Sequence, residues 1–148
     1  MRPGEPFPWA PNEIKEVKLT ASEQNNKEKQ AEITLSAGGK TIPAILNTSL
    51  ASKELISRLP YTVDLHRYEH DYCGVMGSPL PYNKEDLKNG WKNGEIAFAA
   101  DGGYFAILYK DEEISMQFGN LVALGQLCED PLVMETLPAR ISLTIDLK

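Results

Sequence analysis

Three short apolar runs in the second half of the chain constrain its fold more than any other feature. The runs are Gly94–Phe98, Phe105–Tyr109 and Gly119–Leu127, and glycines open, precede or interrupt them. Apolar runs of this length, bounded by turn residues, are typical of strands, and their spacing predicts a small closed β-barrel. The last segment, Ile141–Leu147, alternates apolar and polar residues. We expect it to pair with the first strand and so to close the barrel.

The first half of the chain predicts a hairpin followed by one helix. Residues 33–35 alternate, Ala37–Lys40 contains two glycines suited to a tight turn, and residues 42–46 alternate again as the return strand. The next segment, Ser49–Leu59, has capping side chains at its start, and Pro60 directly follows its end. We expect this helix to pack over one open end of the barrel through a buried face formed by Leu55, Ile56 and Leu59.

These patterns together predict a mainly β protein. We expect a closed, mostly antiparallel barrel of about eight strands, capped by one or two short helices. The barrel domain is expected to span residues 31–148. Residues 1–30 are expected to form an extended N-terminal arm, partly disordered or contributing an edge strand near residues 15–20, because four prolines fall within the first 12 residues.

Composition narrows the classes of partner. The 148 residues carry a net charge of −6 and a pI near 5.0, which argues against nucleic acid or an anionic membrane surface. No apolar run approaches the ~20 residues of a membrane span, and the N-terminus lacks the apolar core of a signal peptide. We therefore expect a cytoplasmic protein, either a monomer or a homodimer.

The metal-binding residue types are too dispersed to predict a metal site. Cys73 and Cys128 lie far apart, and neither has a histidine in metal-site spacing. His66 and His70 fall on the solvent side of a predicted strand, roughly 13 Å apart, which is too far to share one ion. We expect no metal, no cofactor and two reduced thiols.

The predicted strand Tyr61–His70 places an arginine at the edge of the core. Its odd positions begin apolar and should face the core, whereas its even positions should face solvent. Arg67 therefore falls on the core side, where that face becomes polar. One interpretation is an ion pair at the barrel rim, with Asp64, Glu69 or Asp71 as the partner. The other is an arginine that faces a ligand.

Several short motifs indicate a known family when they are taken together. The hairpin and helix lead into Ser57–Pro60, and Gly94–Phe98 is followed by Gly103–Tyr109, with Ala99–Gly103 as the intervening turn. From about Glu32 to Lys148 the chain resembles a family of small bacterial and archaeal cyclophilin-like domains, whose strand signature has a Pro-Pro-Gly turn at this place. The resemblance implies a barrel of the cyclophilin type. It implies no reaction, because that family has no established activity.

Peptidyl-prolyl isomerases of the cyclophilin fold resemble the chain at fewer positions. Leu65–Arg67 is similar to their Phe-His-Arg triplet, and Tyr72 falls where an aromatic pocket wall is expected. Val75 stands where their glutamine belongs, Leu121 replaces their pocket histidine, and Met116 replaces a tryptophan. The resemblance implies that Arg67 could stabilise a twisting imide bond, but that the side chains which position the substrate are missing.

The sequence predicts a binding domain in preference to an enzyme. No nucleophile and base stand in a recognisable motif, and the glycine-rich stretches lack the strand-to-helix context of phosphate loops. We expect a peptide or small molecule to bind in a cleft on the barrel wall, lined by Arg67, Tyr72, Phe98, Met116 and Phe118. A weak peptidyl-prolyl isomerase that uses Arg67 is the alternative. The wider aromatic set, which adds Tyr68, Tyr82 and Tyr104, forms either a ligand cleft or merely the core and ordinary exposed tyrosines.

Overall fold

The structure, a computed structural model, describes residues 30–148. All but the last residue of the predicted arm, and with it the predicted strand near residues 15–20, lies outside the described residues. Ala31–Lys148 forms one unit by itself. Its strands are β2 (Ala31–Ala37), β3 (Lys40–Leu46), β4 (Tyr61–Arg67), β5 (Asp71–Val75), β6 (Leu87–Lys88), β7 (Glu95–Ala99), β8 (Tyr104–Leu108), β9 (Leu121–Leu127) and β10 (Arg140–Leu147). Its helices are α2 (Leu50–Ser57) and three 3₁₀ segments, η1 (Lys84–Asp86), η2 (Glu112–Gln117) and η3 (Pro131–Thr136).

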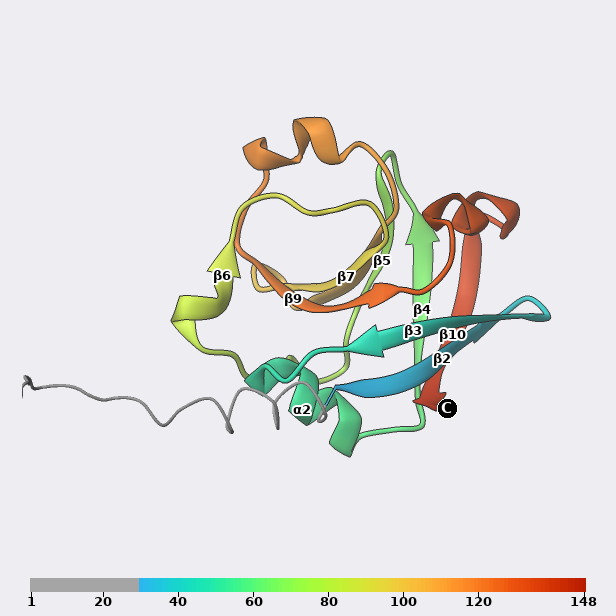
Figure 1. The fold of residues 1–148 in the computed structure, drawn as a ribbon, viewed down its shortest axis with the longest axis horizontal. Coiled ribbons are helices and arrows are strands. Elements are labelled where there is room, and N and C mark those ends of the chain that lie inside the picture. Colours follow the sequence, from blue (N-terminus) through green and yellow to red (C-terminus); the bar gives the residue numbers. More distant parts are fainter. Residues whose placement is uncertain (1–29) are drawn as a thin grey trace, which may run out of the picture. The chain divides into compact units, whose positions relative to one another are not determined.

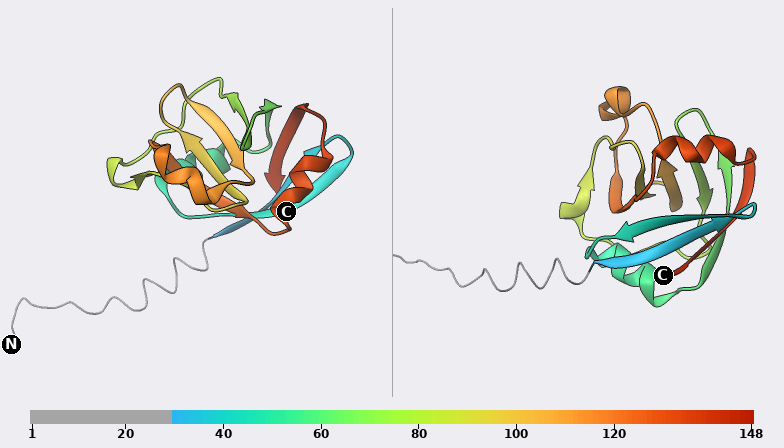
Figure 2. Two further views of the ribbon diagram at one scale, coloured as in Figure 1. Left: turned by 90° about the horizontal axis from the view of Figure 1, so that it is seen from above. Right: turned by 45° about the vertical axis from the view of Figure 1, so that its right-hand side comes forward.

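Eight antiparallel strands close into a barrel (Figure 1), as the sequence predicts. Their order is β3-β2-β10-β4-β5-β8-β7-β9, and pairing of β3 with β9 completes the ring, while β6 adds two residues beside β9. The last strand, β10, pairs with β2 on one side and with β4 on the other. The predicted closure by the terminal strand is therefore confirmed, and the two views in Figure 2 show the ring from other directions.

The β2–β3 hairpin forms at the predicted glycines. Gly38 and Gly39 occupy the two turn positions with φ of 57° and 81°, a region that glycine enters without steric cost. Every residue of β2 then finds a register partner in β3, from Ala37–Lys40 back to Ala31–Leu46. A two-residue turn fixes this register, and the register places the apolar side chains of both strands on the same inner face.

Helix α2 begins at a cap built from hydroxyl and amide side chains. Ser49 Oγ accepts the Ser52 N–H at 3.2 Å, and Asn47 Oδ1 accepts the Ser49 N–H at 3.0 Å. Figure 1 shows the helix at one end of the barrel, and Leu55 inserts fully into the core. Ile56 and Leu59 were also expected to be buried, but they pack against the core with part of their surface exposed. Of the three apolar residues predicted to be buried, only Leu55 is therefore fully covered by the barrel.

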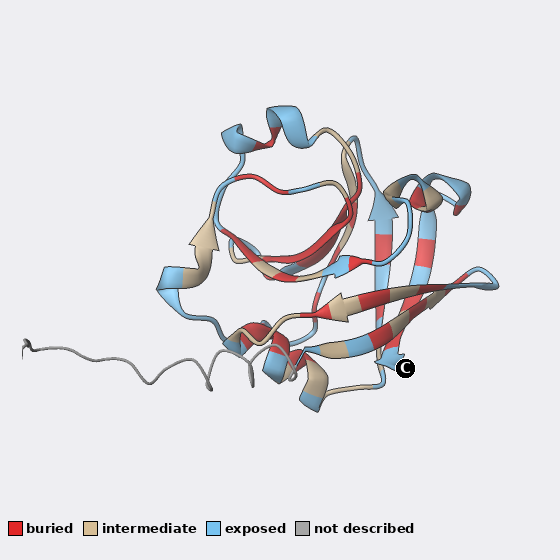
Figure 3. Cartoon of the chain, viewed as in Figure 1, coloured by how far each residue is buried: buried red, intermediate tan, exposed pale blue. Residues whose placement is uncertain are grey.

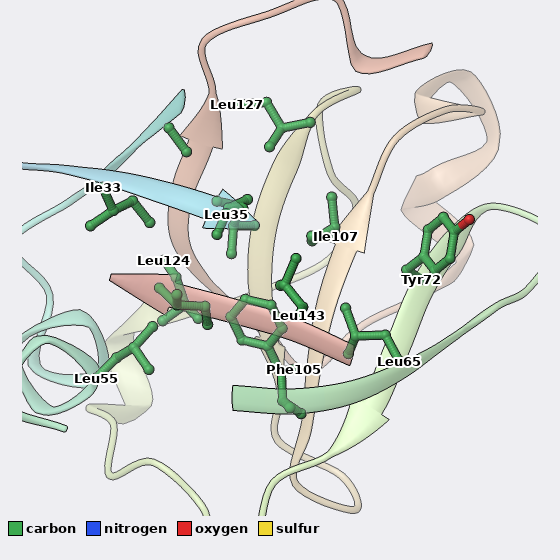
Figure 4. Close-up of a cluster of buried hydrophobic side chains, with 14 of the residues drawn as sticks. Ile33, Leu35, Leu55, Leu65, Tyr72, Phe105, Ile107, Leu124, Leu127 and Leu143 are labelled. Atoms are coloured by element: carbon green, nitrogen blue, oxygen red, sulfur yellow. The ribbon is translucent and has the colours of Figure 1, made fainter. Parts of the chain in front are cut away.

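The core fills the barrel with the inward side chains of its strands. Buried residues alternate with intermediate ones along most of β2 and β3, and with mostly exposed ones along β10 (Figure 3), as a period of two requires. Figure 4 shows the side chains of different strands meeting at the centre, among them Leu35, Phe105 and Leu143. Tyr72 lies at the edge of this cluster, with its hydroxyl directed away from it. Within residues 30–148, no helix has the length and apolar character needed to cross a membrane.

Strand β4 has the predicted parity but ends earlier than expected. Val63 and Leu65 are buried, and Thr62 and His66 on the other face are exposed. The strand stops at Arg67, and the next three residues turn the chain into β5, closed by a bond of 2.6 Å from the Tyr68 N–H to the Asp71 carbonyl. His70 therefore lies in a turn instead of on the solvent face of a strand, which corrects its predicted placement.

Candidate functional site

The five predicted ligand-binding residues lie in three different places. Tyr72 and Phe98 are buried in the core, Arg67 ends β4, and Met116 and Phe118 are exposed at η2 and just after it. Only Arg67 and Tyr72 are in polar contact, since Nη1 of Arg67 lies 3.5 Å from the Tyr72 hydroxyl. The structure therefore does not gather all five residues around one cleft.

Arg67 and Tyr72 together hold the backbone that leads into β10. Nη1 of Arg67 donates to the Leu137 carbonyl at 3.1 Å, and the Tyr72 hydroxyl lies 3.1 Å from the same oxygen and 2.5 Å from the Pro138 carbonyl. Burial raises the pKa of the Tyr72 phenol, which keeps it protonated and able to donate. Among residues 30–148 no carboxylate pairs with Arg67, so the predicted ion pair with Asp64, Glu69 or Asp71 does not form.

The surface beside Arg67 is a charged recess. Its volume is about 460 Å³, and it is lined by Arg67, Tyr68, Glu69, Tyr109, Lys110 and Glu135. Lys110 Nζ lies 3.1 Å from Glu135 Oε2 across this recess. A proline ring requires apolar walls to exclude water, and a recess with four charged side chains does not supply them.

A larger groove lies on the barrel wall between β4 and β5. Its volume is about 620 Å³, which falls within the usual range of ligand pockets. The exposed side chains of Tyr68, Val75 and Tyr104 stand around it, beside polar groups that make up more than half of its accessible lining. The complete lining is Tyr61, Thr62, Val63, Asp64, His66, Tyr68, Cys73, Gly74, Val75, Gly77 and Tyr104.

The groove exists because the β4–β5 ladder stops after two residue pairs. His66 pairs with Cys73 and Arg67 with Tyr72, and no further pair is formed between these strands. At the next residue, Gly74, the two backbones come so close that an added Cβ would lie 1.9 Å from the Asp64 carbonyl oxygen. β5 pairs with β8 along all five of its residues, so from Gly74 onward β8 is its one strand partner, and the groove lies beside the first half of β4. Glycine, which has no side chain, is therefore required at position 74, where the two backbones approach each other.

The groove carries one permanent charge and no reactive thiol. Asp64 is the only acidic or basic side chain in its lining apart from His66. Burial, and then the neighbouring Asp71 carboxylate, raise the pKa of Cys73 to about 12, so this thiol stays protonated at neutral pH. Within residues 30–148, no group of three or more His, Cys, Asp or Glu side chains is placed to hold a metal ion.

A second cluster, outside the barrel, was not foreseen from the sequence. Trp91 is buried against Ala97 and Ala106 on the outer faces of β7 and β8, and its Nε1 donates to the Lys110 carbonyl at 2.9 Å. His70 lies against the rings of Trp91 and Phe118, with centroids 5.8 and 5.6 Å away. In the sequence, the small side chains of Ala97 and Ala99, two positions apart on one face of β7, are the pattern that could have indicated a large side chain packed over that face.

His70 belongs to this second cluster and not to the open surface. Its Nδ1 lies 2.7 Å from Asp111 Oδ2, and its side chain is only 17% exposed. Asp111, at the N-cap of η2, adopts a left-handed conformation with φ of 67°. The cluster fixes η2 to the barrel. Met116 and Phe118, at η2 and just after it, are therefore placed by contacts that stabilise the fold.

Comparison with known protein families identifies the family to which the barrel domain belongs. Residues 35–146, about three quarters of the chain, match the sequence profile of the Cyclophilin-like family. The chain belongs to the Cyclophilin-like family. Among proteins with curated descriptions, none matches this Cyclophilin-like chain in sequence.

One solved structure supports the same assignment at the level of the fold. The solution structure of a hypothetical protein from Archaeoglobus fulgidus superposes with a TM-score of 0.63 at 10% sequence identity. The match covers 80% of this chain and 95% of that one. A likeness at this identity concerns the barrel alone, and neither protein gains a function from it.

Two residues of the Cyclophilin-like chain that replace isomerase pocket residues lie outside the recess beside Arg67. Val75, in the place of their glutamine, is exposed at the mouth of the wall groove. Leu121, in the place of their histidine, is buried in the cluster around Trp91. Neither side chain can donate a hydrogen bond to a peptide backbone.

Proposed function

We propose that this domain binds an extended peptide segment in the groove between β4 and β5 and catalyses no reaction. The observation that carries the proposal is the short β4–β5 ladder of two residue pairs, beside which the barrel wall has a groove of about 620 Å³. Folded proteins tend to close, cover or charge such an interruption in a sheet, because unpaired strand groups attract other strands. Here it is bordered by exposed Tyr68, Val75 and Tyr104 instead.

The rim supports a peptide in preference to a compact ligand. The groove is lined mainly by residues of β4 and β5, so an extended chain can lie along it with alternate side chains against the walls. Tyrosine side chains supply a large contact area with few rotatable bonds, which reduces the entropy lost on binding.

The isomerase alternative has less support. Nη1 of Arg67, the one arginine suited to that chemistry, is already bonded to the Leu137 carbonyl, and the recess beside it is charged. A proline substrate would have to compete with this intramolecular bond. It would also lack the groups that hold its own backbone.

The proposal is tested by selecting peptides from a random octapeptide display library on the immobilised full-length protein. Affinities of the enriched peptides are then measured by fluorescence anisotropy. We expect Tyr104→Ser and Val75→Ser each to weaken binding about tenfold, because both remove apolar contact area at the rim. The matched controls are Ile114→Ser, whose side chain is 43% exposed against 42% for Tyr104, and Leu132→Ser, 52% against 63% for Val75. Absence of enrichment, or equal losses in the controls, would overturn the proposal.

A further inference from the structure

The free edge of β4 offers a more specific mode of recognition. We infer that the bound peptide adds a short strand beside Thr62 and that Asp64 selects a basic side chain in that peptide. This inference rests on the proposed function, because it specifies how the same groove is used. It is argued from the direction of the β4 backbone groups, from the charge of the lining and from the contacts of Asp64.

The hydrogen bonds of β4 alternate between its two neighbours. The Arg67 N–H donates to Ala139 at 2.7 Å on the β10 side, whereas the Tyr68 N–H donates to Asp71 on the β5 side. In an antiparallel ladder successive residues bond to opposite sides, so the odd residues of β4 bond to β10 and the even residues point toward β5. The N–H and C=O of Thr62 therefore face the groove.

Thr62 has no strand partner on that side among the described residues. The β4–β5 ladder ends at the His66–Cys73 pair, and Gly74 blocks the position next to Asp64. Gly77, which follows β5, borders the groove, and an added Cβ there would meet nothing within 4 Å. A peptide residue placed opposite Thr62 can thus exchange two backbone hydrogen bonds with it without displacing β5.

Asp64 supplies the charge that such a peptide would meet. Its side chain lies on the same exposed face as that of Thr62, and no ion pair or side-chain hydrogen bond engages it among residues 30–148. Arg140, opposite His66 on β10, lines a recess together with Asp64 but forms no ion pair with it. A peptide residue opposite Thr62 is a diagonal neighbour of Asp64, which is within reach of a lysine or arginine side chain.

The charge preference is tested with the same octapeptide library. We expect the peptides enriched by the wild-type protein to carry Lys or Arg at one aligned position. Against Asp64→Asn their affinity should fall about three- to fivefold at low ionic strength, and against Asp64→Lys by more than tenfold. The loss with Asp64→Asn should shrink as salt is added. Glu113→Gln, which removes one exposed charge on η2, is the matched control and should leave the affinity unchanged.

Strand addition is tested separately by N-methylation of each amide of the best peptide in turn. We expect a loss of about tenfold at one amide, that of the peptide residue opposite Thr62, and small effects at the others, because Thr62 alone offers free backbone groups on this side of β4. Enriched peptides that lack either the basic position or this single sensitive amide would overturn the inference and leave the proposed function standing. Failure to enrich any peptide would overturn both.

Discussion

Two neighbouring strand pairs of the same barrel differ in how completely they are covered. β7 and β8 pair along all five residues, and both of their faces are buried, one by the barrel core and one by the cluster around Trp91. β4 and β5 pair at two positions, and the outer face of β4 is exposed. The first pair is built for stability. The second leaves backbone groups and aromatic side chains available, so a barrel can carry a binding site where its ladder is left unfinished.

The largest expected effect concerns the covered pair. We expect Trp91→Ala to lower the free energy of unfolding by about 3–5 kcal/mol, because it removes a buried indole from the outer face of β7 and β8. Tyr104→Ala at the groove rim should cost less than about 1 kcal/mol. Urea denaturation followed by circular dichroism compares the two. Equal losses in the free energy of unfolding would contradict the claim that the β7–β8 pair is packed more completely than the β4–β5 region.

The narrow crossing that opens the groove is tested by Gly74→Ala. The new methyl group would lie 1.9 Å from the Asp64 carbonyl oxygen, a backbone atom that cannot move aside cheaply. We expect a loss of about 3 kcal/mol or more in the free energy of unfolding. Gly77→Ala is the matched control, since its Cβ would enter open space and its effect should stay within about 1 kcal/mol of neutral. A tolerated Gly74→Ala would contradict the close approach of the two strands.

Arg67 belongs to one of the two residue pairs that β4 and β5 form, and we expect its replacement to lower the stability less than the two changes above. Arg67→Ala should cost about 1–3 kcal/mol of stability through the lost bond to the Leu137 carbonyl. Arg140→Ala, which breaks no described bond, should be close to neutral.

In a protease-coupled prolyl peptide assay, we expect the wild type to match the uncatalysed rate. Catalysis that falls tenfold or more in Arg67→Ala would instead support the isomerase alternative.

Sequence reasoning succeeded where the determining contacts are local. The alternation in β2 and β10 and the two glycines of the first hairpin depend on residues close in the chain, and both predictions are confirmed. The groove depends on Gly74 meeting Asp64, ten positions earlier, and no local pattern reveals that distance. Trp91 was overlooked because it lies in a polar stretch, and its burial depends on strands that follow it. Of the five predicted ligand residues, the barrel uses Tyr72 and Phe98 for packing, which no local pattern distinguishes from a pocket wall.

The most direct test of an open wall is amide hydrogen exchange along β4 in the free protein, read residue by residue by NMR. Val63 and Leu65 bond to β10 in the closed part of the sheet and should exchange slowly. The Thr62 amide faces the groove without a described strand partner and should exchange at a rate close to that of an unstructured peptide. An amide at Thr62 protected as strongly as that of Val63 would mean that the wall is closed there, and it would contradict the binding site placed between β4 and β5.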